Sequence, residues 1–78
     1  MWEVHYSREA ATYLEDNATL IADLFLAVES LADADGMPLT GEYREVQGFI
    51  HWSVQEHIVV LRRIEQSRVV RVLVLKPD

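Results

Sequence analysis

Arginine side chains near the C-terminus are the residues in this sequence best suited to bind an anion. The segment from Ile58 to Lys76 is mostly apolar, yet it holds five of the seven Lys and Arg residues: Arg62, Arg63, Arg68, Arg71 and Lys76. A guanidinium group is planar and pairs with two oxygens of a phosphate or a carboxylate at once. The spacing therefore suggests a clamp made by Arg71 with either Arg62 or Arg63, depending on which of the two shares its face.

The same arginines also fit a structural explanation. In a sheet they can pair across strands with acidic residues, for which the candidates are Glu45, Glu56 and Glu65. Charged residues on strands also protect a sheet from pairing with other chains. The sequence leaves both interpretations open.

His51 is the candidate for proton transfer. It lies in a segment with strand-like alternation, and an imidazole beside an arginine can act as a general acid or base near neutral pH. The alternative is an ordinary surface histidine, which is also how we interpret His5 and His57. Three scattered histidines make a poor zinc site, and the chain has no cysteine. We therefore expect no metal and no cofactor.

The composition is that of a small acidic globular protein. The chain has 78 residues, a net charge of −6 and 50% hydrophobic residues, which predicts one domain over residues 1–78. Such a charge argues against non-specific nucleic-acid binding but is compatible with a local basic patch. No apolar run approaches the roughly 20 residues of a membrane span, so we expect a cytoplasmic protein. Motifs of small-molecule enzymes, such as a glycine-rich phosphate loop, are absent.

The first half of the chain predicts a strand followed by two helices. "WEVHYS" alternates polar and apolar residues, as a strand with one buried face does. Ser7 stands at the expected N-cap of a helix that begins at Arg8, and Asn17 is available to cap a second helix. That helix carries one apolar stripe, made of Leu20, Ile21, Leu24, Phe25, Val28, Leu31 and Ala32. The two form a helical hairpin over about residues 8–35.

The second half predicts strands. "YREVQGFIHWSV" fits one long strand that is bent or bulged near Gly48, and "IVVLRRI" and "RVVRVLVLK" fit two more. The order β-α-α-β-β-β predicts an α+β fold, in which the hairpin packs on one face of a mainly antiparallel sheet. Val70, Val72 and Val74 should face the helices, which leaves Arg71 on the open face.

Aromatic residues divide into core and surface candidates. We expect a first group in the core: Trp2, Tyr6, Phe25 and Phe49. The last two strands carry apolar residues on both faces, and an apolar surface of this kind marks an association site. The candidate binding residues of this surface are Tyr43, Arg44, Trp52 and Lys76. The sheet therefore predicts a protein partner or a homodimer.

The order of elements resembles the RelE/ParE superfamily of toxins from bacterial type II toxin–antitoxin modules. The resemblance covers the whole chain and lies in "WEVHYSREAATYLE", "LADADG", "LTGEYREVQGFIHWSV" and the two valine-rich closing strands. It implies ribosome-dependent mRNA cleavage without a metal, or inhibition of DNA gyrase, and neutralisation by a cognate antitoxin. For a nuclease it implies that Arg71, with Arg62 or Arg63, stabilises the anionic transition state while His51 moves protons.

The resemblance also allows a non-catalytic function. The chain is acidic, and the apolar Ile58 and Val59 fall where ribosome-dependent members carry an arginine. The alternative is therefore a catalytically inactive protein of the same fold, serving as a homodimer or as an adaptor that binds other proteins.

Overall fold

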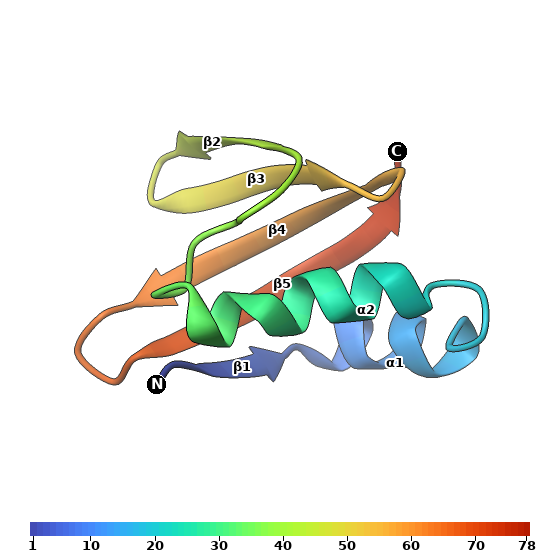
Figure 1. Ribbon diagram of the computed structural model, residues 1–78, viewed down its shortest axis with the longest axis horizontal. Coiled ribbons are helices and arrows are strands. Elements are labelled where there is room, and N and C mark those ends of the chain that lie inside the picture. The colour runs from blue at the N-terminus through green and yellow to red at the C-terminus, as the bar shows by residue number, and fades with distance from the viewer.

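Two helices pack on a five-stranded mixed sheet, so the predicted α+β class and layout are confirmed. The computed structural model describes residues 1–78 (Figure 1). The elements in chain order are β1 (Glu3–Tyr6), α1 (Arg8–Asp16), α2 (Ala22–Glu29), the 3-10 helix η1 (Ser30–Asp33), β2 (Glu42–Val46), β3 (Phe49–Val54), β4 (His57–Ile64) and β5 (Val69–Pro77). Neither helix has the length and apolar character needed to cross a membrane.

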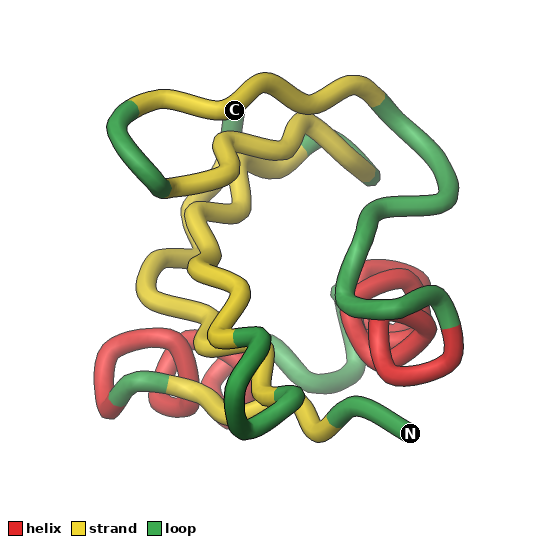
Figure 2. The backbone as a smooth tube through the Cα atoms, turned by 90° about the vertical axis from the view of Figure 1, so that its left-hand side faces the viewer, coloured by secondary structure: helices red, strands yellow, loops and turns green.

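The sheet places the first and last strands of the chain side by side. Its order is β1-β5-β4-β3-β2, with β1 parallel to β5 and every other pair antiparallel. The sheet is curled, and α2 lies in the hollow of the curve (Figure 2). Helix α1 instead follows directly from β1 and runs along β5. The parallel pair matters for the site, because it brings β1 beside the arginine-bearing strands.

The core fills the space between α2 and the hollow face of the sheet. Four residues of the predicted helical stripe are buried there: Ile21, Leu24, Val28 and Leu31. The expectation for Phe25 was wrong, because its side chain is 43% exposed. The buried residues recur every three or four positions and already occupy the face of the helix that contacts the sheet. Phe25 lies beside this face, so its side chain is partly exposed to solvent. Trp2 is buried as expected, whereas Tyr6 and Phe49 are half-buried.

Ser7 joins α1 to β5. Its Oγ accepts a hydrogen bond from the Ala10 amide at 3.1 Å, as an N-cap does. The same hydroxyl donates to the Leu73 carbonyl at 2.7 Å. Asn17, predicted to cap the second helix, instead donates to the Tyr13 carbonyl at 2.8 Å and closes α1.

The segment around Gly48 is a hairpin, which corrects the prediction of one bent strand. Strands β2 and β3 pair antiparallel, with Val46 opposite Phe49. The two turn residues, Gln47 and Gly48, both have positive φ, at 51° and 86°. Positive φ at both residues is typical of a type I′ turn. The twist of this turn matches the right-handed twist of the two strands that it connects. A period of two holds on both sides of such a turn and only its phase changes, as it does at a bulge, so the pattern resembles that of one bulged strand.

A bulge in the β4–β5 pair changes which valines face the core. The pairing register shifts between Val60 and Leu61. Val72 is buried as predicted, but Val74 is half-exposed and Leu75 is buried in its place. An extra residue in one strand reverses the alternation beyond it, so the expectation for Val74 was wrong.

Candidate functional site

The face of the sheet turned away from α2, called the open face below, carries most of the cationic side chains. On β4, Val59 and Leu61 are buried toward α2, and Arg62 lies on the opposite side. Cross-strand pairing then assigns the neighbours of Arg62 to the same face. Four cationic residues, from three strands, lie there: Arg44, Arg62, Arg71 and Lys76.

Arg62 and Arg71 lie directly opposite each other on β4 and β5. Both are exposed, and neither has an ionic partner, since the ion pairs of the structure are His5–Glu3 and Arg63–Glu65. The cross-strand carboxylate partners that a structural explanation requires are therefore missing for these two arginines. Like charges directly opposite each other are destabilising. An anion bound between the two guanidinium groups would remove this repulsion.

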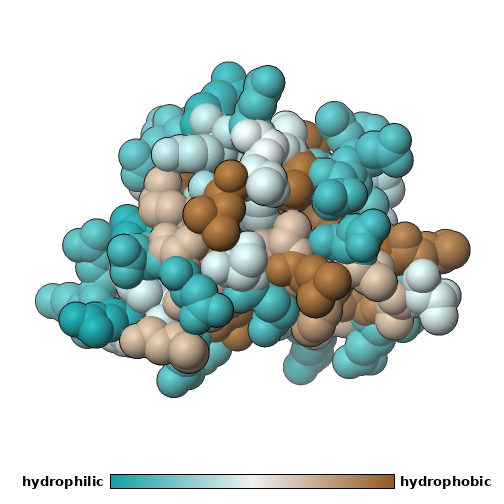
Figure 3. All heavy atoms as spheres, in the orientation of Figure 1, coloured by the Kyte–Doolittle hydropathy of each residue, from teal (hydrophilic) through white to brown (hydrophobic).

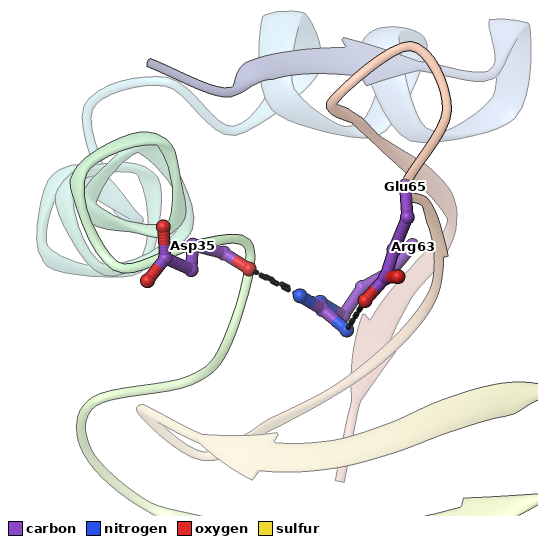
Figure 4. A network of polar contacts seen from close by, with 3 residues as sticks. All are labelled: Asp35, Arg63 and Glu65. Atoms are coloured by element: carbon purple, nitrogen blue, oxygen red, sulfur yellow. Dashed lines mark hydrogen bonds and ion pairs between the residues drawn. The ribbon is translucent and has the colours of Figure 1, made fainter.

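Arg63, the alternative partner of Arg71, lies on the α2 side of the sheet (Figure 4). Its Nη2 and Nε donate to the Asp35 carbonyl at 2.6 and 3.1 Å, and Nη1 contacts Glu65 at 3.3 Å. The guanidinium carbon lies 4.7 Å from the centre of a Trp2 ring, a cation–π distance. Arg63 thus fixes the loop after η1, and the structure assigns the open-face position to Arg62.

His5 joins the arginine pair, which sequence reasoning missed. It lies directly opposite Arg71 in the parallel β1–β5 pair, so His5, Arg71 and Arg62 form a row across three strands. Its Nε2 is 3.0 Å from Glu3 Oε1. Only the pairing of β1 with β5 creates this row, and alternation within β1 gives no signal of it.

His51 occupies the neighbouring row of the open face. It lies opposite Arg44 on β2 and Val60 on β4, and it is diagonal to Arg62. Diagonal side chains in such a pair start about 7–8 Å apart, within the combined reach of a histidine and an arginine. A shallow groove opens beside it, lined by Glu42, Tyr43, Arg44, His51, Ser53 and Ile58.

The other three candidate binding residues, Trp52, Tyr43 and Lys76, lie in different parts of the structure. Trp52 is 0% exposed, and its indole nitrogen donates to the Thr40 carbonyl at 2.6 Å. Trp52 is therefore a core residue, which corrects its assignment to a binding surface. Tyr43 is 49% exposed on the edge strand, and Lys76 lies opposite Ile58, away from the arginine pair.

The open face carries apolar residues as expected, but the more exposed apolar side chains lie on α2 and at the sheet edge. Valines of the open face such as Val60 are only half-exposed. A groove between α1 and α2 is lined by Leu14, Glu15, Ala18, Ile21, Ala22, Phe25 and Leu26. Figure 3 shows hydrophobic residues over the side of the molecule where α2 runs.

Charge is divided between the two sides of the molecule. On the open face, the four cations face only two acids, Glu3 and Glu42, and both lie on the outermost strands. The remaining acidic residues lie on the helices, in the turns, at the chain end and, for Glu45, on the other side of β2. A chain with a net charge of −6 thus presents a positive face, which sequence composition alone does not show.

Comparison with known proteins identifies the fold. No protein-family model matches the chain, and no curated protein is similar to it in sequence. A solved crystal structure, described as a metal-bound toxin from Helicobacter pylori, superimposes with a TM-score of 0.70 at 18% identity. The match covers 100% of this chain and 96% of that one. In the present chain no three His, Asp or Glu side chains are placed to hold a metal ion. The chain therefore shares the fold of that toxin.

Proposed function

We propose that this protein is a RelE/ParE-type toxin that cleaves mRNA on the ribosome in the cytoplasm. The observation that carries the proposal is the Arg62–Arg71 pair, which is exposed, lacks a carboxylate partner and has His5 next to it. The shared fold with a toxin supports the class of function, and the positive open face supports a phosphate-bearing target.

The reaction that we assign to the row of His5, Arg71 and Arg62 is transesterification of RNA. A ribose 2′-hydroxyl attacks the adjacent phosphorus, the bond to the 5′-oxygen breaks, and a 2′,3′-cyclic phosphate forms. Arg62 and Arg71 would bind the non-bridging oxygens, whose negative charge grows in the transition state. A proton leaves the 2′-hydroxyl and another reaches the 5′-oxygen, and His5 and His51 are the candidates for these transfers.

The proposal includes an antitoxin that binds the groove between α1 and α2. Leu26 and Phe25 on this groove are exposed, and acidic residues such as Glu15 and Asp23 lie on the same two helices. An amphipathic segment with apolar and basic residues would complement this surface. The natural candidate is the product of a small neighbouring gene.

The decisive experiment is inducible expression in a bacterium of the wild-type chain and of the variant Arg62→Ala/Arg71→Ala. We expect the wild type to arrest growth, stop amino-acid incorporation and produce cleaved mRNA detectable by primer extension. Removing one transition-state donor commonly costs about 10²–10³-fold in rate, so the double variant should be harmless. Arg8→Ala, which removes an exposed arginine at the start of α1, is the matched control and should stay toxic.

Urea unfolding of the arginine variants shows whether a loss of toxicity is caused by a loss of folding. Since the two arginines repel each other, Arg71→Ala should unfold at the same urea concentration as the wild type or a higher one. Toxicity retained in the double variant would rule out this site. Growth arrest with altered DNA supercoiling and intact mRNA would indicate gyrase inhibition instead. Normal growth with the wild type would indicate an inactive, partner-binding protein of this fold.

A further inference from the structure

The outer edge of the sheet at β2 is free and exposed. Strand β2 pairs only with β3, and all five of its residues are exposed. In Figure 1 it forms the upper border of the sheet. Tyr43 and Val46 are large apolar residues of this strand that are 49% and 38% exposed. Free edges of this kind pair readily with another strand unless something prevents it.

The hairpin decides which backbone groups this edge offers. In a two-residue hairpin, the residues flanking the turn, here Val46 and Phe49, form a hydrogen-bonded pair, and such pairs alternate along the strands. Arg44 therefore also bonds to β3. Tyr43 and Glu45 direct their N–H and C=O groups outward, ready for a further strand.

Charge restricts how two copies of β2 can pair. Residues opposite each other must point to the same face, so a two-fold axis between antiparallel β2 strands places one residue opposite itself. An axis at Glu42, Arg44 or Glu45 sets like charges face to face. An axis at Tyr43 instead places Glu42 of each copy opposite Arg44 of the other, and Tyr43 opposite Tyr43.

We propose that two copies of this chain associate through β2 in the register centred on Tyr43. The two Glu42–Arg44 pairs are then non-hydrogen-bonded pairs, the type with the closer side chains. Within one copy, neither Glu42 nor Arg44 has an ionic partner. The two sheets become one continuous sheet, and the two positive open faces join on one side. This inference does not depend on the toxin function.

A cysteine scan along β2 tests the register, because the chain has no cysteine of its own. In the proposed dimer, the two Cα atoms at position 43 are about 5.5 Å apart, within disulfide range. Tyr43→Cys should therefore form a covalent dimer under mild oxidation. Arg44→Cys and Glu45→Cys are the matched controls and should link far more slowly, since their copies are offset along the strand. Faster linking at position 44 or 45, or equal linking at all three, would overturn the proposal.

A charge exchange provides the second test, by sedimentation over a range of concentrations. Glu42→Arg and Arg44→Glu should each weaken the dimer about tenfold or more, because two attractive pairs become repulsive. The double variant restores opposite charges and should dimerise like the wild type. A wild-type chain that stays monomeric at its solubility limit, or a double variant as weak as the single ones, would contradict the proposal.

Discussion

At the residue scale, two adjacent arginines of β4 have opposite surroundings. Arg63 points toward α2, donates to the Asp35 carbonyl and lies over Trp2. Arg62 points to the open face, beside Arg71, without an ionic partner. Stability explains the position of the first. For Arg62, the like charge of Arg71 is destabilising, and the anionic ligand that we propose would offset this repulsion.

Tyr6 gives a prediction about pH at the same scale. Its hydroxyl donates to Glu29 at 2.5 Å. Burial, then the hydrogen bond to Glu29, then the charge of Glu29, raise the pKa of Tyr6 well above its ordinary value of 10.0. The folded state thus holds this proton more tightly than the unfolded state. Tyr6 therefore contributes its full stabilisation of the folded state below pH 10. We expect the free energy of unfolding to fall as the pH rises above 10.

Urea unfolding at a series of pH values measures this effect. Tyr6→Phe is the control, because other groups also titrate at alkaline pH. The variant should be less stable at neutral pH by about 1.5–3 kcal/mol, the range for a hydrogen bond to a charged group. It should also lose less stability than the wild type above pH 10. Parallel pH profiles for the two proteins would contradict the assigned role of Tyr6.

At the element scale, the β3–β4 hairpin contains a strained turn. Gln55 and Glu56 both have positive φ, at 49° and 60°. Residues other than Gly, Asn and Asp reach this region at a cost of roughly 1–2 kcal/mol each. Asn-Gly is the pair that a type I′ turn favours. The variant Gln55→Asn/Glu56→Gly should therefore be more stable by about 1 kcal/mol.

Thermal unfolding followed by circular dichroism checks this prediction. Glu56→Ala serves as the control, since it removes the exposed carboxylate but keeps the Cβ that causes the strain. The control should unfold near the wild-type temperature, and the Asn-Gly variant at a higher one. Equal gains in both variants would mean that charge, and not backbone strain, limits this hairpin.

At the scale of the whole molecule, the division of charge matters more than the net charge. The acidic helices and turns favour solubility, whereas the open face presents Arg44, Arg62, Arg71 and Lys76 to the solvent. A single-stranded RNA bound by four cations loses affinity with salt at a slope of about −3 in log K against log salt concentration. We expect this slope in the fluorescence anisotropy of a labelled RNA.

Two variants show whether this face is the binding surface. Arg62→Ala/Arg71→Ala should reduce the slope to about half, because two of the four contacts are removed. Arg8→Ala should leave it unchanged, since Arg8 lies on α1. A slope that the double variant does not alter would place RNA binding elsewhere.

Much of the fold follows from the sequence because local periodicity determines it. The alternation of β1, the Ser7 cap and the buried part of the apolar stripe, from Ile21 to Leu31, depend on contacts within a few residues, and these predictions are confirmed. Local patterns predict less well where two different structures have the same side-chain period. The hairpin at Gln47 and Gly48 is an example, because a bulged strand and a tight hairpin both keep a period of two on either side of the irregularity.

The arrangement of the site depended on contacts that no local pattern encodes. The sequence by itself determined that Arg71 lies opposite the core-facing valines. The tertiary structure alone decided that Arg62 joins it, through the register of β4 on β5, and that His5 completes the row, through the parallel pairing of β1. Strand register is set by packing and turns across the whole sheet. Residues far apart in the chain therefore become neighbours only in the folded molecule.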